Sequence, residues 1–228
     1  MKDAAKREIA RERVREIAAE HTARGNQLGW FDAVYSEASG NIDSIPWADL
    51  EPNHFFKRWA KERGLKGEGR KALVVGCGLG YDARYLFELG FDVTAFDLSQ
   101  TAIEWAKTLH KDTNIQFETS DLFQPFRGWL GSFHFVLEIY TIQPLSMEMR
   151  SRAIDSVASF VAPSGELVVV CRGREDEEEV GQIPYPLSKK DLSRFEENGL
   201  DEREFVEIPD DEEEGVRRFV VHYKRPRS

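Results

Sequence analysis

Residues 71–97 constrain the fold of this 228-residue chain more than any other segment does. The segment begins with an apolar run, residues 72–75, which has the length and the β-branching of a strand buried on both faces. The turn Gly76-Cys77-Gly78-Leu79-Gly80 follows at once. Closely spaced glycines let the backbone turn tightly and approach a ligand without interference from Cβ atoms. The segment therefore predicts a strand that leads through a ligand-binding turn into a helix.

A second strand and a carboxylate complete this unit. The helix is predicted at residues 82–89, and residues 91–96 form the next strand, which ends at Asp97. A carboxylate at this place can accept hydrogen bonds from both hydroxyls of a ribose. The alternative role for Asp97 is to cap the helix that begins near Ser99, although Ser99 can cap that helix by itself. We favour the ribose role, because the glycine turn and the carboxylate support each other.

The rest of the chain supplies further strands and the polar residues that follow them. Five runs have the composition of strands, namely residues 115–119, 133–139, 166–171, 204–208 and 217–223. Residues 162–165 have the composition of a turn that enters the 166–171 strand. Glu138 and Tyr140 lie near the carboxyl end of the 133–139 strand, where open α/β sheets place their ligands.

The glycine turn resembles the first motif of the class I S-adenosylmethionine-dependent methyltransferases, which is a strand followed by Gly-x-Gly-x-Gly. A dinucleotide-binding turn instead requires a small residue where this chain has Tyr81. The resemblance implies an α/β, Rossmann-like, doubly wound fold: a mostly parallel seven-stranded sheet with a closing antiparallel strand and an N-terminal helical extension. S-adenosyl-L-methionine is the cofactor that it implies.

The resemblance also implies which residues hold this cofactor. In the family, the turn holds the methionine moiety, and an acidic residue after the third strand meets the adenine amino group. Asp121 matches that acidic residue, and a surface turn is its alternative role. The predicted cofactor-binding residues are Trp30, Trp47, Gly76, Cys77, Gly78, Gly80, Asp97, Leu98, Asp121, Leu122 and Glu138.

A narrower resemblance is to the thiopurine and thiol/halide methyltransferase branch. It is carried by Trp30-Phe31, by Ile45-Pro46-Trp47 and by Gly181-Gln182-Ile183-Pro184-Tyr185. In that branch a Trp and a Pro-Trp pair close over the cofactor, and a Pro-Tyr loop lies beside the acceptor pocket. The resemblance implies a small-molecule acceptor such as a thiol, a halide or a similar soft nucleophile. Tyr140, Tyr185 and Arg172 are the predicted substrate-binding residues.

The need for a catalytic side chain depends on the acceptor. Methyl transfer from a sulfonium donor mainly requires in-line positioning and exclusion of water. A thiol or halide needs no general base, whereas a hydroxyl or amine does. Tyr140 and Glu138 are the candidate catalytic residues, with His134 nearby. His134 lies between two phenylalanines in an apolar strand, so we expect a hydrogen-bonded core histidine. Arg172 and Arg174 either hold a carboxylate-bearing substrate or pair with the acidic run 175–179, and of these two roles we favour the pairing.

The charge and composition of the chain limit which partners, metals and cellular locations are expected. The net charge of −10, with acidic runs at residues 175–179 and 210–214, disfavours RNA or DNA. Five scattered histidines lack metal-ligand spacing, so no metal is predicted. Two cysteines fit a reducing compartment better than a disulfide framework. Without a signal-peptide pattern or a membrane-length apolar run, the expected location is the cytoplasm.

The chain divides into a charged N-terminal extension, residues 1–27, and a methyltransferase domain, residues 28–228. The extension is predicted to form a helix or lid, with Ile9, Val14 and Ile17 loosely on one side. Two alternatives to a methyltransferase remain open. One is a non-catalytic sensor of S-adenosylmethionine or its demethylated product, and the other is a nicotinamide-dependent oxidoreductase, against which Tyr81 argues.

Overall fold

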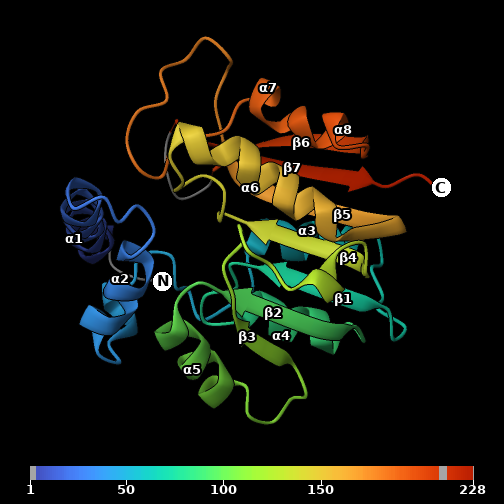
Figure 1. The fold of residues 1–228 in the computed structure, drawn as a ribbon, viewed down its shortest axis with the longest axis horizontal. Helices are drawn as coiled ribbons and strands as arrows, with labels where there is room; N and C mark the ends of the chain where they lie inside the picture. The colour runs from blue at the N-terminus through green and yellow to red at the C-terminus, as the bar shows by residue number, and fades with distance from the viewer. Residues whose placement is uncertain (1–3, 211–214, 228) are drawn as a thin grey trace.

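A computed structural model of the chain describes residues 4–210 and 215–227. Within these residues one sheet contains seven strands, β1 (Lys71–Val75), β2 (Asp92–Asp97), β3 (Gln116–Thr119), β4 (Phe133–Ile139), β5 (Val161–Gly173), β6 (Asp201–Pro209) and β7 (Arg217–Lys224). Their order is β3-β2-β1-β4-β5-β7-β6 (Figure 1). The first five strands are parallel, and β7 is antiparallel to both β5 and β6.

The strand order reverses beside β1. The chain runs outward from β1 to β2 and β3 and then returns to β4 on the other side of β1. Val75, the last residue of β1, is paired with Phe96 on β2 and with Glu138 on β4. The glycine turn therefore lies between the carboxyl ends of β2 and β4, at the switch point where open α/β sheets bind ligands.

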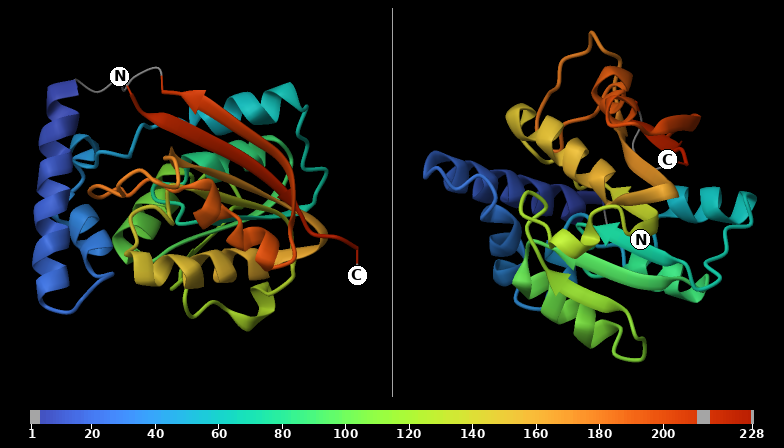
Figure 2. Two further views of the ribbon diagram at one scale, coloured as in Figure 1. Left: turned by 90° about the horizontal axis from the view of Figure 1, so that it is seen from above. Right: turned by 45° about the vertical axis from the view of Figure 1, so that its right-hand side comes forward.

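Helices pack on both faces of the sheet (Figures 1 and 2). One face is covered by α3 (His54–Glu62), α4 (Tyr81–Glu88) and α5 (Gln100–Leu109). The other is covered by α6 (Met147–Phe160), α7 (Lys189–Leu192) and α8 (Arg194–Glu197). Along β1, Leu73 and Val75 pack into one cluster and Ala72 and Val74 into the other. The strand is thus buried on both faces, as its apolar run predicts.

A separate cap lies beside this core. It consists of α1 (Ala4–Ala23), α2 (Trp30–Ala38) and the short helix η1 (Ile42–Ser44). The long helix α1 stands at one side of the molecule in the left view of Figure 2. Val14 and Ile17 are buried in the cap, whereas Ile9 is 67% exposed, although all three lie on the side of α1 that faces α2 and η1.

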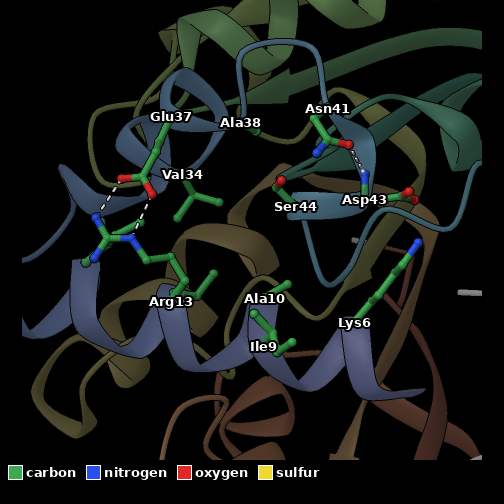
Figure 3. A pocket seen from close by; sticks show the side chains of 12 residues that line it. Lys6, Ile9, Ala10, Arg13, Val34, Glu37, Ala38, Asn41, Asp43 and Ser44 are labelled. Atoms are coloured by element: carbon green, nitrogen blue, oxygen red, sulfur yellow. Dashed lines mark hydrogen bonds and ion pairs between the residues drawn. The ribbon is translucent and has the colours of Figure 1, made fainter. Parts of the chain in front are cut away.

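The helices α1 and α2 are also joined by charge, as Figure 3 shows. Arg13 donates through Nε and Nη2 to the two carboxylate oxygens of Glu37, at 2.7 and 2.8 Å. A small cavity of about 370 Å³ lies between this pair, the apolar side of α1 and the Asn41 turn. The cap is therefore held together by a cluster of buried apolar side chains and by a bidentate ion pair.

Two local predictions differ from the structure. Residues 162–165 lie within β5, where they bulge, because Phe133 pairs with Val161 whereas Phe135 pairs with Glu166. His134 is exposed and accepts a hydrogen bond at Nδ1 from the Lys71 amide, at 3.3 Å. The expectation of a core histidine is therefore wrong. Because His134 lies at the amino end of β4, away from the carboxyl ends of the strands, it cannot act as a base at a site located there. Residues 211–214 of the acidic run, and residues 1–3 of the extension, lie outside the described residues.

None of the helices in the described part of the chain combines the length and apolarity needed to cross a bilayer. In the same residues no group of three or more His, Cys, Asp or Glu side chains could hold a metal ion.

Candidate active site

A cavity of about 860 Å³ opens at the carboxyl ends of the parallel strands. This volume lies within the usual range for small-molecule sites, about 300–1,000 Å³. Its walls come from the glycine turn, the tips of β2 to β5, the start of β7, the helices α1 and α2, and the segment between η1 and α3. The structure brings together there the predicted residues Trp30, Trp47, Gly76, Cys77, Gly78, Gly80, Asp97, Leu98, Asp121 and Leu122.

The turn between β1 and α4 requires glycine at three places. Gly76, Gly78 and Gly80 have φ values of 58°, 51° and 82°, which side-chain-bearing residues rarely adopt. A Cβ atom on Gly76 would lie 2.3 Å from Oγ1 of Thr141, and one on Gly78 would lie 2.9 Å from the Tyr35 hydroxyl. The turn is a concave backbone surface that a side chain would fill, which suits close approach by a ligand.

Asp97 connects this turn to the next strand. Its carboxylate accepts hydrogen bonds from the amides of Gly78 and Ser99, each at 2.9 Å. Burial raises the pKa of Asp97, and these backbone hydrogen bonds oppose that shift. Ser99 caps α5 by accepting from the Ala102 amide at 3.0 Å. The capping role is thus already filled, and Asp97 is positioned at the cavity wall.

Aromatic side chains from α2 and from the segment after η1 also line the cavity. Trp47 donates through Nε1 to the Tyr35 hydroxyl at 2.8 Å, and the two rings meet edge to face. Trp30 lies edge to face with Trp47, with ring centroids 6.5 Å apart, and stacks on Phe31. Burial and the Asp97 charge raise the pKa of Tyr35 well above its usual value, so it remains a neutral phenol. Aromatic faces of this kind suit a cation.

The comparisons with known proteins agree with this geometry. Residues 72–165 match the family model described as a methyltransferase domain. The matched segment runs from β1 into β5 and so includes the glycine turn and Asp97. The prediction of a Rossmann-like fold is thereby confirmed, and the match supports the predictions of a methyltransferase and of S-adenosylmethionine as cofactor, whereas the thiopurine and thiol/halide branch stays a prediction.

A curated relative is the 2-heptyl-1-hydroxyquinolin-4(1H)-one methyltransferase of Mycobacteroides abscessus. It is 25% identical over 150 residues, which span 64% of this chain and 64% of the relative. Two solved structures share the fold. The cyclase SpnF superposes with a TM-score of 0.70 at 15% identity over 89% of this chain and 96% of that one. The N-methyltransferase NodS from Bradyrhizobium japonicum WM9, in complex with S-adenosylhomocysteine, has a TM-score of 0.64 at 19% identity over 85% and 97%.

Beyond the glycine turn, the cavity continues toward β4, β5 and β7. Tyr140 and Arg172, two of the three predicted substrate-binding residues, line this end. Tyr140 has φ of 59°, a conformation that holds its side chain at the β4 tip against the Arg218 guanidinium, 5.3 Å from the ring centroid. The alternative role of Arg172, pairing with the acidic run 175–179, stays a prediction.

Tyr185 and Glu138 do not line the cavity. The Tyr185 ring lies 5.4 Å from the Arg150 guanidinium, while Ile183 and Pro184 of the same loop reach the cavity. Glu138 is fully buried behind the β4 tip, where Oε1 accepts hydrogen bonds from the Thr141 and Ile142 amides at 2.6 and 3.0 Å. Burial raises its pKa to about 7. The structure thus corrects the prediction that Glu138 contacts the cofactor: it supports the loop that carries Tyr140.

Burial keeps both cysteines in the neutral thiol form. Cys77 lines the cavity, and burial together with the Asp97 charge raises its pKa well above the usual value. Cys171 is buried at the end of β5, and its pKa is raised by burial as well. Both are free of disulfides. Each therefore remains a neutral thiol at physiological pH, and Cys77 acts as a small residue in the turn.

The sequence analysis did not identify several polar residues that lie in the cavity wall or beside it. Asp82 lines the cavity and accepts from the Asn53 amide at 2.8 Å, while burial raises its pKa to about 6. Asp32 accepts from Oγ of Ser99 at 2.6 Å and so ties α2 to α5. Arg11 and Arg218 reach the cavity from α1 and β7. Asp82 could have been predicted from the sequence, because it lies in the first turn of the helix after the glycines. Asp32, Arg11 and Arg218 could not, because they reach the site through contacts between distant segments.

Proposed function

We propose that the chain catalyses methyl transfer from S-adenosylmethionine to a small-molecule acceptor. The observation that carries the proposal is the single cavity that joins the glycine turn and Asp97 to a separate end lined by Tyr140 and Arg172. When bound, S-adenosylmethionine supplies an electrophilic methyl group, so this chain's residues need to orient the acceptor in line and to exclude water.

In this proposal the cofactor lies across the tips of β1, β2 and β3. Asp97 accepts from the ribose hydroxyls, and the glycine turn holds the amino-acid end. Asp121, whose Oδ1 accepts from the Phe123 amide at 2.8 Å, is oriented toward the adenine amino group. Trp30 and Trp47 surround the sulfonium, where each cation–π contact contributes about 0.5–2 kcal/mol.

The N-terminal extension, residues 1–27, acts in this proposal as a lid over the methyltransferase domain of residues 28–228. Arg7, Arg11 and Val14 of α1 line the same cavity as the glycine turn, which supports this role. A cytoplasmic location fits the two free thiols.

Two acceptor classes follow from different observations. The resemblance of Trp30, Trp47 and the loop 181–185 to the thiol/halide branch favours a soft nucleophile. The curated relative, by its name, acts on a hydroxyquinolinone, and apolar walls at Leu28, Phe31 and Leu145 suit such a planar heteroaromatic molecule.

Mass spectrometry of methylated products tests the proposal and separates the acceptor classes. We expect product from S-adenosylmethionine with either a 1-hydroxyquinolin-4-one or thiophenol, and less product from the Asp97→Ala variant with the same acceptor when S-adenosylmethionine is limiting. Product from thiophenol and iodide but not from the hydroxyquinolinone supports the soft-nucleophile class. Binding of S-adenosylhomocysteine without product from any of them contradicts the proposal and favours a sensor.

A further inference from the structure

The cap meets the rest of the molecule at the amino end of α5, directly after the strand that ends in Asp97. Asp32 on α2 accepts two hydrogen bonds there through Oδ1, one from the Ser99 hydroxyl at 2.6 Å and one from the Thr101 amide at 3.1 Å. Neither Asp32 nor Ser99 belongs to the described residues that line the cavity. This contact can therefore affect the site only through the residues that it holds in place.

Asp32 brings to the amino end of α5 a negative charge that the helix itself lacks. The first turn of α5 contains no acidic residue. Unpaired amides and the helix dipole make this end of a helix a favourable place for an anion. Burial opposes ionisation of Asp32, but hydrogen bonds from Ser99, Thr101 and Ser36 outweigh it and lower the pKa of Asp32. Asp32 is therefore a carboxylate at neutral pH and caps α5 from another helix.

Ser99 connects this contact to the carboxylate that is predicted to bind ribose. Its amide donates to Oδ1 of Asp97 at 2.9 Å, and its Oγ accepts from the Ala102 amide while it donates to Asp32. Ser99 is 0% exposed, so water cannot replace Asp32 as the acceptor unless Ser99 moves. A buried donor without an acceptor is unfavourable. Loss of Asp32 therefore favours movement of Ser99, whose amide holds Asp97.

Asp32 also lies on the helix that supplies aromatic side chains to the cavity. Trp30 and Tyr35 of α2 line the cavity, one on each side of Asp32 in the sequence. The Asp97 carboxylate is held from the other direction by the Gly78 amide, which donates to Oδ2 at 2.9 Å. The Asp32–Ser99 contact thus joins the aromatic part of the site to the carboxylate at the β2 tip.

We propose that Asp32 is a positioning residue that couples docking of the cap on α5 to the orientation of Asp97. This inference rests on the proposed function and specifies how the same site is regulated. A cofactor that binds the Asp97 carboxylate stabilises the position of Ser99 that Asp32 also requires, so cofactor binding and cap docking strengthen each other. The coupling is reciprocal by linkage, and release of the Asp32 contact therefore weakens cofactor binding.

A double-mutant cycle on S-adenosylhomocysteine affinity tests the inference. Calorimetry is carried out on the unmodified full chain, on Asp32→Ala, on Asp97→Ala and on the double variant. We expect Asp32→Ala to weaken binding about tenfold when Asp97 is present, and no more than about twofold in the Asp97→Ala background. Asp32→Asn keeps a carbonyl oxygen that can accept from Ser99 and Thr101, so its loss should be about threefold. If far-ultraviolet circular dichroism shows that Asp32→Ala does not fold, Asp32→Asn takes its place in the cycle.

Ser36→Ala is the matched control. Ser36 is exposed one turn after Asp32 on α2, donates to Oδ2 of Asp32 at 3.3 Å, and shares a hydrogen bond with the Thr101 hydroxyl at 3.1 Å. It belongs to the same α2–α5 contact without bonding to Ser99, so its substitution should leave the affinity within about twofold.

Three results overturn the inference. They are an unchanged affinity in Asp32→Ala, the same factor of loss with and without Asp97, and an equal loss in Ser36→Ala. The second would mean that Asp32 only packs the cap and does not act through Asp97. Failure of the unmodified chain to bind S-adenosylhomocysteine is a different result, since it removes the proposed function itself.

Discussion

The Gly78 amide donates a hydrogen bond to the Asp97 carboxylate at 2.9 Å. This contact joins the two parts of the predicted motif, the turn after β1 and the carboxylate at the end of β2. It orients the carboxylate at the cavity wall, where its remaining lone pairs face the ribose hydroxyls in the proposed complex. A buried acceptor that is held by backbone donors is preorganised, so a ligand does not have to order it.

Asp97→Ala should weaken binding of S-adenosylmethionine by about 2 kcal/mol, or about thirtyfold, the scale of hydrogen bonds to a charged group. Isothermal titration calorimetry measures the change. Asp92→Ala is the control, because Asp92 is exposed at the opposite end of the same strand. Unchanged affinity in the Asp97 variant would contradict the proposal that Asp97 binds the ribose hydroxyls.

Gly76→Ala should destabilise the domain and weaken cofactor binding. The new Cβ would lie 2.3 Å from Oγ1 of Thr141, and the residue would keep a φ of 58°. Strain of this kind costs about 1–3 kcal/mol, which urea unfolding detects. Gly128→Ala is the control, because a Cβ there meets nothing within 4 Å and its φ is not positive. Equal unfolding free energies for the two variants would show that the turn tolerates a side chain.

The sheet and the cofactor end could be predicted because their signals are local. Apolar runs mark strands that are buried on both faces, and closely spaced glycines mark a turn with left-handed backbone. The 133–139 strand was predicted with the bounds of β4, and the strand at 217–223 differs from β7 by one residue. The position of Asp97 at the cavity wall could be predicted because it is the last residue of the second strand.

The acceptor end could not be predicted to the same depth because it is assembled from distant segments. Arg218 meets Arg172 only through the β5–β7 register. Tyr185 is turned from the cavity because the Arg150 guanidinium lies on its ring and donates to its carbonyl at 3.0 Å. The burial of His134 was predicted wrongly from the two phenylalanines beside it, because its position at the amino end of β4 leaves it exposed. Such contacts leave no periodic pattern in the sequence.

Glu138→Gln should stabilise the domain at pH 8 relative to pH 5. Burial raises the pKa of Glu138 from 4.5 to about 7, so the folded state binds the proton more tightly than the unfolded state does. Stability from this group is therefore present below pH 4.5 and falls as the pH rises to about 7. At about 1.4 kcal/mol for each tenfold difference in proton affinity, the loss reaches about 3 kcal/mol. Gln is neutral and can still accept from the Thr141 and Ile142 amides through its carbonyl.

Urea unfolding of both proteins at pH 5 and pH 8 measures this effect. Subtracting the two pH differences cancels the contributions of other groups, such as Asp82, whose pKa burial also raises. We expect the free energy of unfolding of the variant to exceed that of the unmodified chain only at pH 8. A difference that is the same at both pH values would mean that Glu138 is charged throughout, with a donor for Oε2 that the described residues do not supply.

Tyr35→Phe should weaken cofactor binding by about 1 kcal/mol without unfolding the cap. The phenol accepts the Trp47 Nε1 hydrogen bond at 2.8 Å, and Trp47, which is 38% exposed, depends on this contact for its orientation in the cavity wall. Loss of one neutral hydrogen bond contributes about this much. Calorimetry with S-adenosylhomocysteine gives the affinity, and the near-ultraviolet circular dichroism of the tryptophans reports the ring's order. Tyr85→Phe, on the face of α4 that packs against Phe56, is the control. If Tyr35→Phe matches that control in both measurements, the Trp47 ring is held by packing alone.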